Sequence, residues 1–212
     1  MLKPSEYTPS FSVILAELIR ECFDEDEVVV ITGSAQVGMY FSSLPFDHLL
    51  FTGSTTVGQK VMYSAAKHLT PITLELGGKS PVIIGPTGNL KRAVKSIVYG
   101  KLFNSGQTCI APDYLFLPEK CIPSFIELAL QFAEELWPTV EGNIDVTSII
   151  NESHCNRILS LFEDARSQGA KIYQPELQKS SDNNMLKERK IPLTIMSDVK
   201  KEMLIMKEEI FA

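Results

Sequence analysis

Short apolar runs alternate with longer segments of helical periodicity along almost the whole chain, and this alternation limits the possible folds most. Short runs rich in β-branched residues are typical of strands in a parallel sheet. Strands separated by helical segments favour an α/β fold with a largely parallel sheet. Strands are predicted at 28–32, 48–51, 72–76, 81–85, 114–118, 170–174 and 191–196, helices at 11–22, 39–43, 57–69, 89–103, 123–136 and 151–169, and a mobile loop at 178–190.

Composition and charge exclude several classes of function. Of the 212 residues, 44% are apolar and 22% are charged, as in an ordinary soluble globular protein. The net charge of −6 argues against a nucleic-acid or anionic-membrane partner, because those need basic patches. No apolar run approaches the roughly 20 residues that cross a bilayer, and the N-terminal residues lack the apolar core of a signal peptide. We therefore expect no nucleic acid, no membrane and a cytoplasmic location.

The cysteines and histidines lack the spacing of a metal site or a disulfide framework. Three of the four cysteines, Cys22, Cys121 and Cys155, lie where a thiol is usually a small hydrophobic or incidental side chain. The three histidines are scattered along the chain. The sequence therefore predicts no metal and a reducing compartment.

Glu75 ends an apolar run and is followed by two glycines in the stretch TLELGGKSP. Partial burial would raise the pKa of this carboxyl group, which suits a general base near neutral pH. Gly77 and Gly78 leave room for a ligand beside it. Taken alone, the stretch is explained as well by a surface glutamate at a strand end, paired with Lys79.

Two further stretches carry residue types that bind or react with ligands. In NSGQTCIAP, Cys109 follows small residues, and an exposed loop cysteine is a nucleophile when its thiolate is stabilised. A packed thiol is the more common role of a lone cysteine. In FTGSTTVG, Gly53 permits a tight turn and Ser54 or Thr55 can cap a helix whose free N–H groups would bind phosphate. An ordinary β–α turn explains the same residues.

Together these stretches resemble the aldehyde dehydrogenase superfamily. LELGGKSP resembles the family's glutamate signature, FNSGQTC its cysteine signature, FTGSTTVG its cofactor-phosphate turn, KPSE its adenosine-ribose motif and KEEIF its nicotinamide-ribose motif. Their order and the interval from glutamate to cysteine are the family's, and the resemblance covers essentially the whole chain. FDEDEVVVITG, LPFDHLLFTGST and APDYLFLP resemble the coniferyl-aldehyde type most.

The resemblance implies how an aldehyde would be oxidised to a carboxylic acid. Cys109 would be the nucleophile that forms a thiohemiacetal and then a thioester, and Glu75 would be the general base that activates the hydrolytic water. The N–H group of Cys109 would donate to the oxyanion, while Asn104, Gly106 and Gln107 would shape the loop.

The resemblance also implies a dinucleotide cofactor, NAD or alternatively NADP. Glu6 near the ribose 2′-hydroxyl would repel a 2′-phosphate, which favours NAD. The implied cofactor contacts are Lys3 and Glu6 at the adenosine ribose, Gly53, Ser54, Thr55, Thr56 and Gly58 in the phosphate turn, Val57 at the adenine, Gly77 beside the nicotinamide and Glu209 at the nicotinamide ribose.

The resemblance is confined to the middle of the family sequence, which implies an incomplete Rossmann-like sheet. Residues 1–77 would be the C-terminal part of the NAD(P)-binding domain, and 78–212 a catalytic domain truncated at its C-terminal end. Ala212 stands where the family continues with glycine. The family's preceding segment supplies the first strands and a second oxyanion donor, and its following segment closes the substrate tunnel and forms the oligomer arm.

We therefore expect uncovered apolar faces, a homodimer only in the intact enzyme, and very slow or no NADH formation by the 212-residue chain alone. Three alternatives remain at this point. They are an inert fragment, a nucleotide-binding or partner-binding module without turnover, and a cysteine-dependent esterase in which Cys109 and Glu75 hydrolyse esters without a cofactor.

Overall fold

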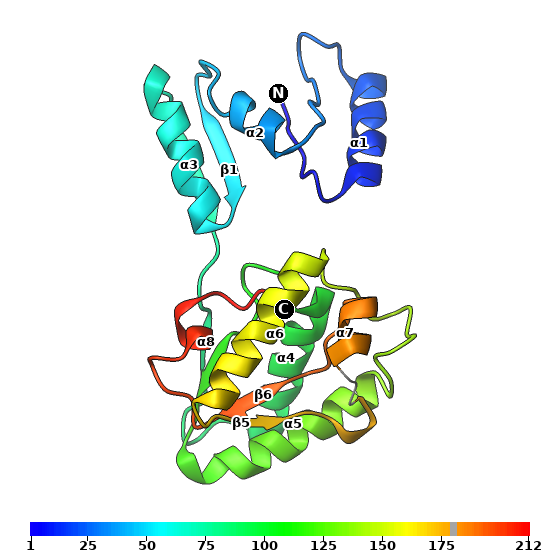
Figure 1. The fold of residues 1–212 in the computed structure, drawn as a ribbon, viewed down its shortest axis with the longest axis vertical. Coiled ribbons are helices and arrows are strands. Elements are labelled where there is room, and N and C mark those ends of the chain that lie inside the picture. The colour runs from blue at the N-terminus through cyan, green and yellow to red at the C-terminus, as the bar shows by residue number, and fades with distance from the viewer. Residues whose placement is uncertain (179–181) are drawn as a thin grey trace. The chain divides into compact units, whose positions relative to one another are not determined.

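The computed structural model describes residues 1–178 and 182–212, which form two compact units, Met1–Gly77 and Gly78–Ala212 (Figure 1). The first unit contains α1 (Pro9–Cys22), α2 (Ala35–Phe41), β1 (Leu49–Gly53), α3 (Thr55–Ala65), the 3-10 turn η1 (Ala66–His68) and β2 (Ile72–Leu76). The second contains β3 (Pro81–Ile83), α4 (Leu90–Leu102), η2 (Phe103–Gly106), β4 (Tyr114–Phe116), η3 (Glu119–Cys121), α5 (Ile122–Leu136), α6 (Glu152–Ser167), β5 (Lys171–Tyr173), η4 (Glu176–Gln178), α7 (Asp182–Glu188), β6 (Ile195–Ser197) and α8 (Leu204–Lys207).

The core of the first unit is a parallel strand pair covered by one helix. Strands β1 and β2 pair in parallel, and α3, which connects them, packs against both. The buried residues Leu49, Val61 and Ala65 form the centre of this core. This arrangement confirms the strands predicted at 48–51 and 72–76, and it fixes where β1, the turn after it and β2 meet.

The predicted strand at 28–32 is wrong. Only Val30 of this run is paired, in an isolated parallel bridge with Leu2. The backbone of Leu2 accepts from Ile31 N and donates to Val29 O, each at 2.8 Å. The apolar side chains of the run are half-buried, and among the described residues this bridge is the one backbone pairing that it forms. High β propensity alone does not make a strand without a partner.

Two predicted helices in this unit have different bounds. Helix α2 begins at Ala35, before the predicted start at position 39, and Ser34 in front of it has an extended N-cap conformation. Helix α3 gives way to a 3-10 turn after Ala65, and Leu69 adopts a left-handed conformation with φ of 56°. Leu69 is therefore 88% exposed and does not belong to the buried face of α3, as its spacing had suggested.

Helix α1 is confirmed, but its apolar stripe is not buried. Phe11, Ile14 and Leu18 are all more than half exposed, whereas Ser12 and Ala16 are the buried residues of the helix. The expectation of uncovered apolar faces therefore holds for α1.

In the second unit, β3 and β4 pair in parallel and α4 packs against α5. Both helices bury one side at intervals of four residues, which confirms their predicted amphipathic character. The main core comprises Ile84, Val94, Val98, Leu102, Phe125, Ala129, Ala133 and Leu193.

Strands β5 and β6 form a separate antiparallel pair, which departs from the largely parallel sheet expected. Helices α7 and α8 both pack on α6, and α7 occupies part of the stretch predicted as a loop. The loop prediction is therefore wrong for Asp182–Glu188 and for Gln178, which ends η4, whereas 189–190 are neither helix nor strand and 179–181 lie outside the described residues.

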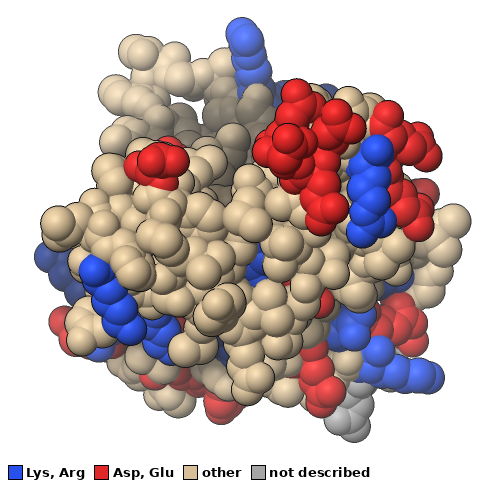
Figure 2. Space-filling model, turned by 90° about the horizontal axis from the view of Figure 1, so that it is seen from above, with Lys and Arg blue, Asp and Glu red and all other residues tan. Residues whose placement is uncertain are grey.

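The described surface agrees with the acidic composition. Figure 2 shows one large group of acidic side chains at the upper right of the face it presents, with further acidic, lysine and arginine side chains scattered over the rest. The run Asp24–Glu27, which follows α1 after Phe23, is exposed. Among the described residues, no helix combines the length and apolar character needed to cross a membrane.

Candidate active site

Glu75 lies in β2, opposite Thr52 of β1. Side chains of a strand alternate between faces, and in β2 Leu74 and Leu76 are half-buried while Glu75 is exposed. The expected partial burial of Glu75 is therefore wrong. Lys79, which the surface alternative pairs with Glu75, belongs to the second unit, where its ammonium group pairs with Asp113.

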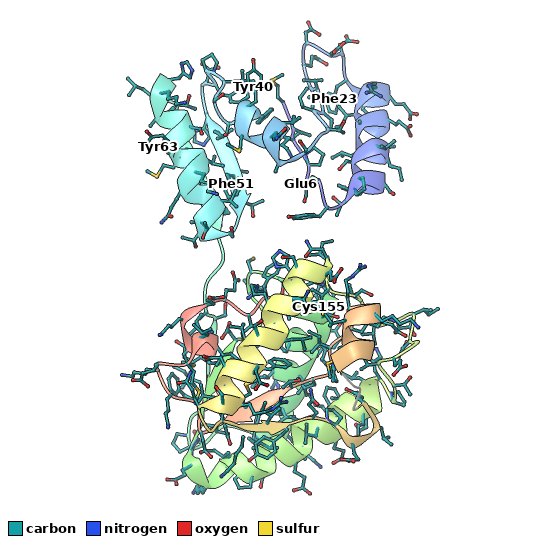
Figure 3. The ribbon with its side chains drawn as sticks, in the orientation of Figure 1. Glu6, Phe23, Tyr40, Phe51, Tyr63 and Cys155 are labelled. Atoms are coloured by element: carbon teal, nitrogen blue, oxygen red, sulfur yellow. The ribbon has the colours of Figure 1, made fainter. Side chains whose placement is uncertain are left out.

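The turn after β1 requires glycine and presents free amides. Gly53 has φ of 156°, and a Cβ there would lie 2.7 Å from the ring of Phe51, which Figure 3 labels on β1. Ser54 caps α3, since its Oγ accepts from Val57 N at 3.3 Å. Among the described residues, the N–H groups of Thr55 and Thr56 have no acceptor. These donors and the positive end of the helix dipole would suit a phosphate.

Gly58 has a packing function in this unit. A Cβ at this position would lie 2.8 Å from Cδ2 of Leu76, so glycine allows α3 to approach β2 closely. Val57, by contrast, is 45% exposed and accessible to a ligand.

Lys3 and Glu6 lie together in the N-terminal segment, where Figure 3 labels Glu6. The Nζ atom of Lys3 is 3.4 Å from Oε2 of Glu6 and donates to Pro4 O at 2.8 Å. A Cβ at Gly38 of α2 would lie 3.0 Å from Cε of Lys3. Gly38 therefore makes room for Lys3, a contact that the sequence alone does not predict.

The loop before Cys109 contains three consecutive residues in the left-handed region. Asn104 and Ser105 have φ of 51° and Gly106 has φ of 73°. Such a conformation is uncommon for residues other than glycine, and asparagine tolerates it best. A Cβ at Gly106 would also collide with the backbone of Ala212. Both the backbone conformation and the nearby main chain of Ala212 therefore favour glycine at position 106.

Gln107 holds this loop in place. Its Nε2 donates to Asn104 O and Ser148 O, both at 3.2 Å, and its Oε1 accepts from Ile150 N at 2.9 Å. The sequence predicts that Gln107 shapes the loop, but not that it connects the loop to Ser148 and Ile150, which lie 41 and 43 residues away.

Replacing Gln107 by alanine is expected to lower the free energy of unfolding by about 1–3 kcal/mol, because three hydrogen bonds to the main chain are lost, each contributing roughly 0.5–1.5 kcal/mol. Urea denaturation of the 212-residue chain measures this change. The matched control is Gln131→Ala, which removes one exposed hydrogen bond to Glu135 and should change stability by less than about 0.5 kcal/mol. Equal losses for the two variants would show that Gln107 does not anchor the loop.

Cys109 is exposed at the end of this loop. Its carbonyl group accepts from Oγ of Ser80 at 3.4 Å, and within the described part of the chain its N–H group has no acceptor. The thiol is therefore accessible, and the N–H group is available to an oxyanion that forms beside the sulfur.

The other cysteines differ from Cys109 in their surroundings. Cys155 lies fully buried in α6, where Figure 3 labels it, and burial raises the pKa of its thiol. A raised pKa lowers the thiolate fraction, so Cys155 is an inert core residue. Cys121 is half-buried and Cys22 is exposed at the end of α1. Across residues 1–178 and 182–212, no group of three or more histidine, cysteine or acidic side chains is placed to hold a metal ion.

Glu209 is half-buried just after α8, among charged residues that the sequence motifs do not identify. Arg157 of α6 donates to Glu209 O at 3.1 Å and to Ile210 O at 2.6 Å. Burial lowers the pKa of Lys101 to about 8, although the charges of Asp113 and Glu209 oppose this effect.

The predicted site residues are divided between the two units. The first unit contains Lys3, Glu6, Gly53, Ser54, Thr55, Thr56, Val57, Gly58, Glu75 and Gly77, and the second contains Cys109 and Glu209. Within its own unit, the structure brings Lys3 to Glu6 and orders the turn around Ser54. That Glu75 and Cys109 act at one site stays a prediction.

Comparison with known proteins supplies the family. The sequence profile of the aldehyde dehydrogenase family matches residues 1–212. The coniferyl aldehyde dehydrogenase of Pseudomonas sp. is 44% identical over 213 residues, which cover 100% of this chain and 44% of that protein. The substrate-bound state of Staphylococcus aureus AldH superposes with a TM-score of 0.83 at 37% identity, covering 99% of this chain and 44% of the other.

A second solved structure is the Staphylococcus aureus betaine aldehyde dehydrogenase in complex with NAD+, with a TM-score of 0.85 at 28% identity over 99% of this chain and 42% of the other. The chain thus spans less than half the length of these relatives. Its mixture of helices and parallel strands is the α/β fold of these proteins. The chain belongs to the aldehyde dehydrogenase family.

Proposed function

We propose that residues 1–212 carry the thiol and the general base of an enzyme that oxidises an aldehyde to a carboxylic acid. The single observation that carries the proposal is the exposed thiol of Cys109, on a loop held by Gln107 and beside its own free N–H group. Membership of the family supports the reaction class. Residues 1–77 would bind the cofactor and residues 78–212 would hold the substrate.

The first unit has groups that fit NAD. The N–H groups of Thr55 and Thr56 at the start of α3 would receive the pyrophosphate, and Lys3 and Glu6 would hold the adenosine ribose. The carboxylate of Glu6 would repel a 2′-phosphate, so we expect NAD rather than NADP. The NAD+ complex of the Staphylococcus aureus betaine aldehyde dehydrogenase supports this choice.

The chain's own residues would act in two stages. The thiolate of Cys109 attacks the aldehyde carbon, the new C–S bond forms, and the carbonyl electron pair moves to oxygen, where the N–H group of Cys109 donates. When bound, NAD would supply the hydride acceptor, and loss of hydride from the thiohemiacetal carbon would leave a thioester on Cys109. Glu75 then removes a proton from water, the hydroxide attacks the thioester, and the C–S bond breaks to release the acid and the thiolate.

For the substrate we propose an aromatic aldehyde of the coniferyl type, and we expect a cytoplasmic homodimer. The 44% identity with the Pseudomonas coniferyl aldehyde dehydrogenase supports the aromatic substrate. The exposed position of Glu75 supports its role as a base that water can reach.

Turnover is best tested in an extended protein, defined as residues 1–212 joined to the flanking segments of the Pseudomonas coniferyl aldehyde dehydrogenase. Its NADH formation is followed by absorbance with coniferyl aldehyde and with octanal. We expect NADH with both and a kcat/KM at least about tenfold higher for coniferyl aldehyde, a difference of about 1.4 kcal/mol. Binding of NAD without turnover would instead identify a nucleotide-binding module, and ester hydrolysis without aldehyde oxidation would identify an esterase.

A further inference from the structure

A largely buried ion pair lies within the second unit. Lys79 is the lysine of the glutamate motif LELGGKSP, Asp113 directly follows the cysteine stretch NSGQTCIAP, and their side chains are only 17% and 5% exposed. Burying two charges costs free energy unless further hydrogen bonds satisfy them. The contacts of this pair therefore indicate what it stabilises.

The pair holds the main chain that carries Glu209. Nζ of Lys79 donates to Ile205 O at 2.8 Å and to Glu208 O at 3.0 Å, in addition to its bond with Asp113. These contacts use all three donors of the ammonium group. The second carboxylate oxygen of Asp113 accepts from Ile210 N at 3.3 Å. Three main-chain groups between positions 205 and 210 are thus held by one ion pair.

Arg157 holds the same segment from α6. Its guanidinium group donates to the carbonyl groups of Glu209 and Ile210 and lies 3.9 Å from Oε2 of Glu208. Among the described residues, the carboxylate of Glu209 itself has no hydrogen-bond or ion-pair partner. The main chain around Glu209 is therefore fixed while its carboxylate remains available.

The Glu209 carboxylate also interacts with charged groups of the same unit. Lys101, at the end of α4, interacts electrostatically with Glu209, Asp113 and Lys79. The buried amine, the ion pair and the carboxylate of Glu209 therefore belong to one cluster on the second unit.

We propose that Lys79 and Asp113 are positioning residues for the dinucleotide, because they hold segment 205–210 so that the Glu209 carboxylate is presented to the nicotinamide ribose. This inference rests on the proposed function. It assigns the lysine of the glutamate motif a role in cofactor binding, which it exerts through the main chain.

The first test measures amide hydrogen exchange in the 212-residue chain, without cofactor. In Asp113→Asn, exchange in segment 205–210 should become at least about tenfold faster, while amides of α4 and α5 stay within about threefold of the parent. The matched control, Lys171→Met, breaks an exposed ion pair with Asp198 in the same unit. It should change exchange neither in segment 205–210 nor in α4 and α5. Unchanged exchange at 205–210, or equal acceleration throughout the unit, would overturn the inference.

The second test measures KM for NAD in the extended protein. Asp113→Asn and Lys79→Met should each raise KM about 10- to 100-fold, the double variant should be no worse than either single one, and Lys79→Arg should recover part of the loss. The rate at which iodoacetamide alkylates Cys109, measured without NAD, should in these variants stay within about threefold of the rate in the parent protein. Faster exchange with an unchanged KM would overturn the cofactor role.

The two tests separate the two proposals. If the extended protein forms no NADH, the proposed function fails, whereas the exchange result still decides whether the ion pair holds segment 205–210.

Discussion

Replacing Cys109 by alanine in the extended protein is expected to lower kcat/KM for aldehyde oxidation by about 10⁴-fold or more. The reason is that the sulfur forms the covalent bond on which every later step depends, and removal of a nucleophile commonly has an effect of this size. Cofactor-independent ester hydrolysis should disappear in the same variant, because it uses the same thiolate. Initial rates of NADH formation and of nitrophenol release measure the two activities.

The control for this variant is Cys22→Ala, which removes the other exposed thiol, at the end of α1 in the first unit. It should retain both activities within about twofold, as expected for a surface substitution. Aldehyde oxidation that survives in Cys109→Ala would remove Cys109 from its assigned role. If Cys109→Ala lost ester hydrolysis but kept aldehyde oxidation, the two activities would depend on different side chains.

Replacing Glu75 by glutamine is expected to slow thioester hydrolysis by about 10²- to 10⁴-fold, because the amide cannot accept a proton from water. The hydride leaves before that step, so the first turnover should remain fast. Stopped-flow measurement should therefore show a burst of NADH equal to the active-site concentration, followed by a slow steady state.

The burst distinguishes a general base from other roles of this carboxylate. Loss of the burst with an unchanged steady-state rate would assign Glu75 to thiol activation or hydride transfer instead. The matched control is Glu17→Gln, an exposed glutamate on α1 in the same unit, which should leave both phases unchanged.

Elements whose signals are local are well predicted from the sequence. Helices α4 and α6 begin where asparagines were expected to start them, and the side chains of Asn89 and Asn151 accept from Arg92 N at 3.0 Å and His154 N at 2.8 Å. These helices also bury residues at helical spacing. An N-cap side chain and the spacing of buried apolar residues both act within one or two helical turns, so these helices can be predicted from the local sequence.

Elements that depend on distant partners are predicted poorly. Among the described residues, the run 28–32 pairs only through the Leu2 bridge despite its strand composition, and α7, in a stretch predicted as a loop, packs on α6. The site shows the same limit. The contacts of Lys79 with Ile205 and Glu208 span 126 and 129 residues, so no local pattern could predict them.

The central claim is that a substrate-derived thioester forms on Cys109 and is hydrolysed with the help of Glu75. The most direct measurement is mass spectrometry of the extended Glu75→Gln protein, quenched in acid after mixing with coniferyl aldehyde and NAD and then digested. The account predicts an acyl adduct on the peptide that contains Cys109. An unmodified Cys109, or an adduct on Cys22, Cys121 or Cys155 instead, would contradict it.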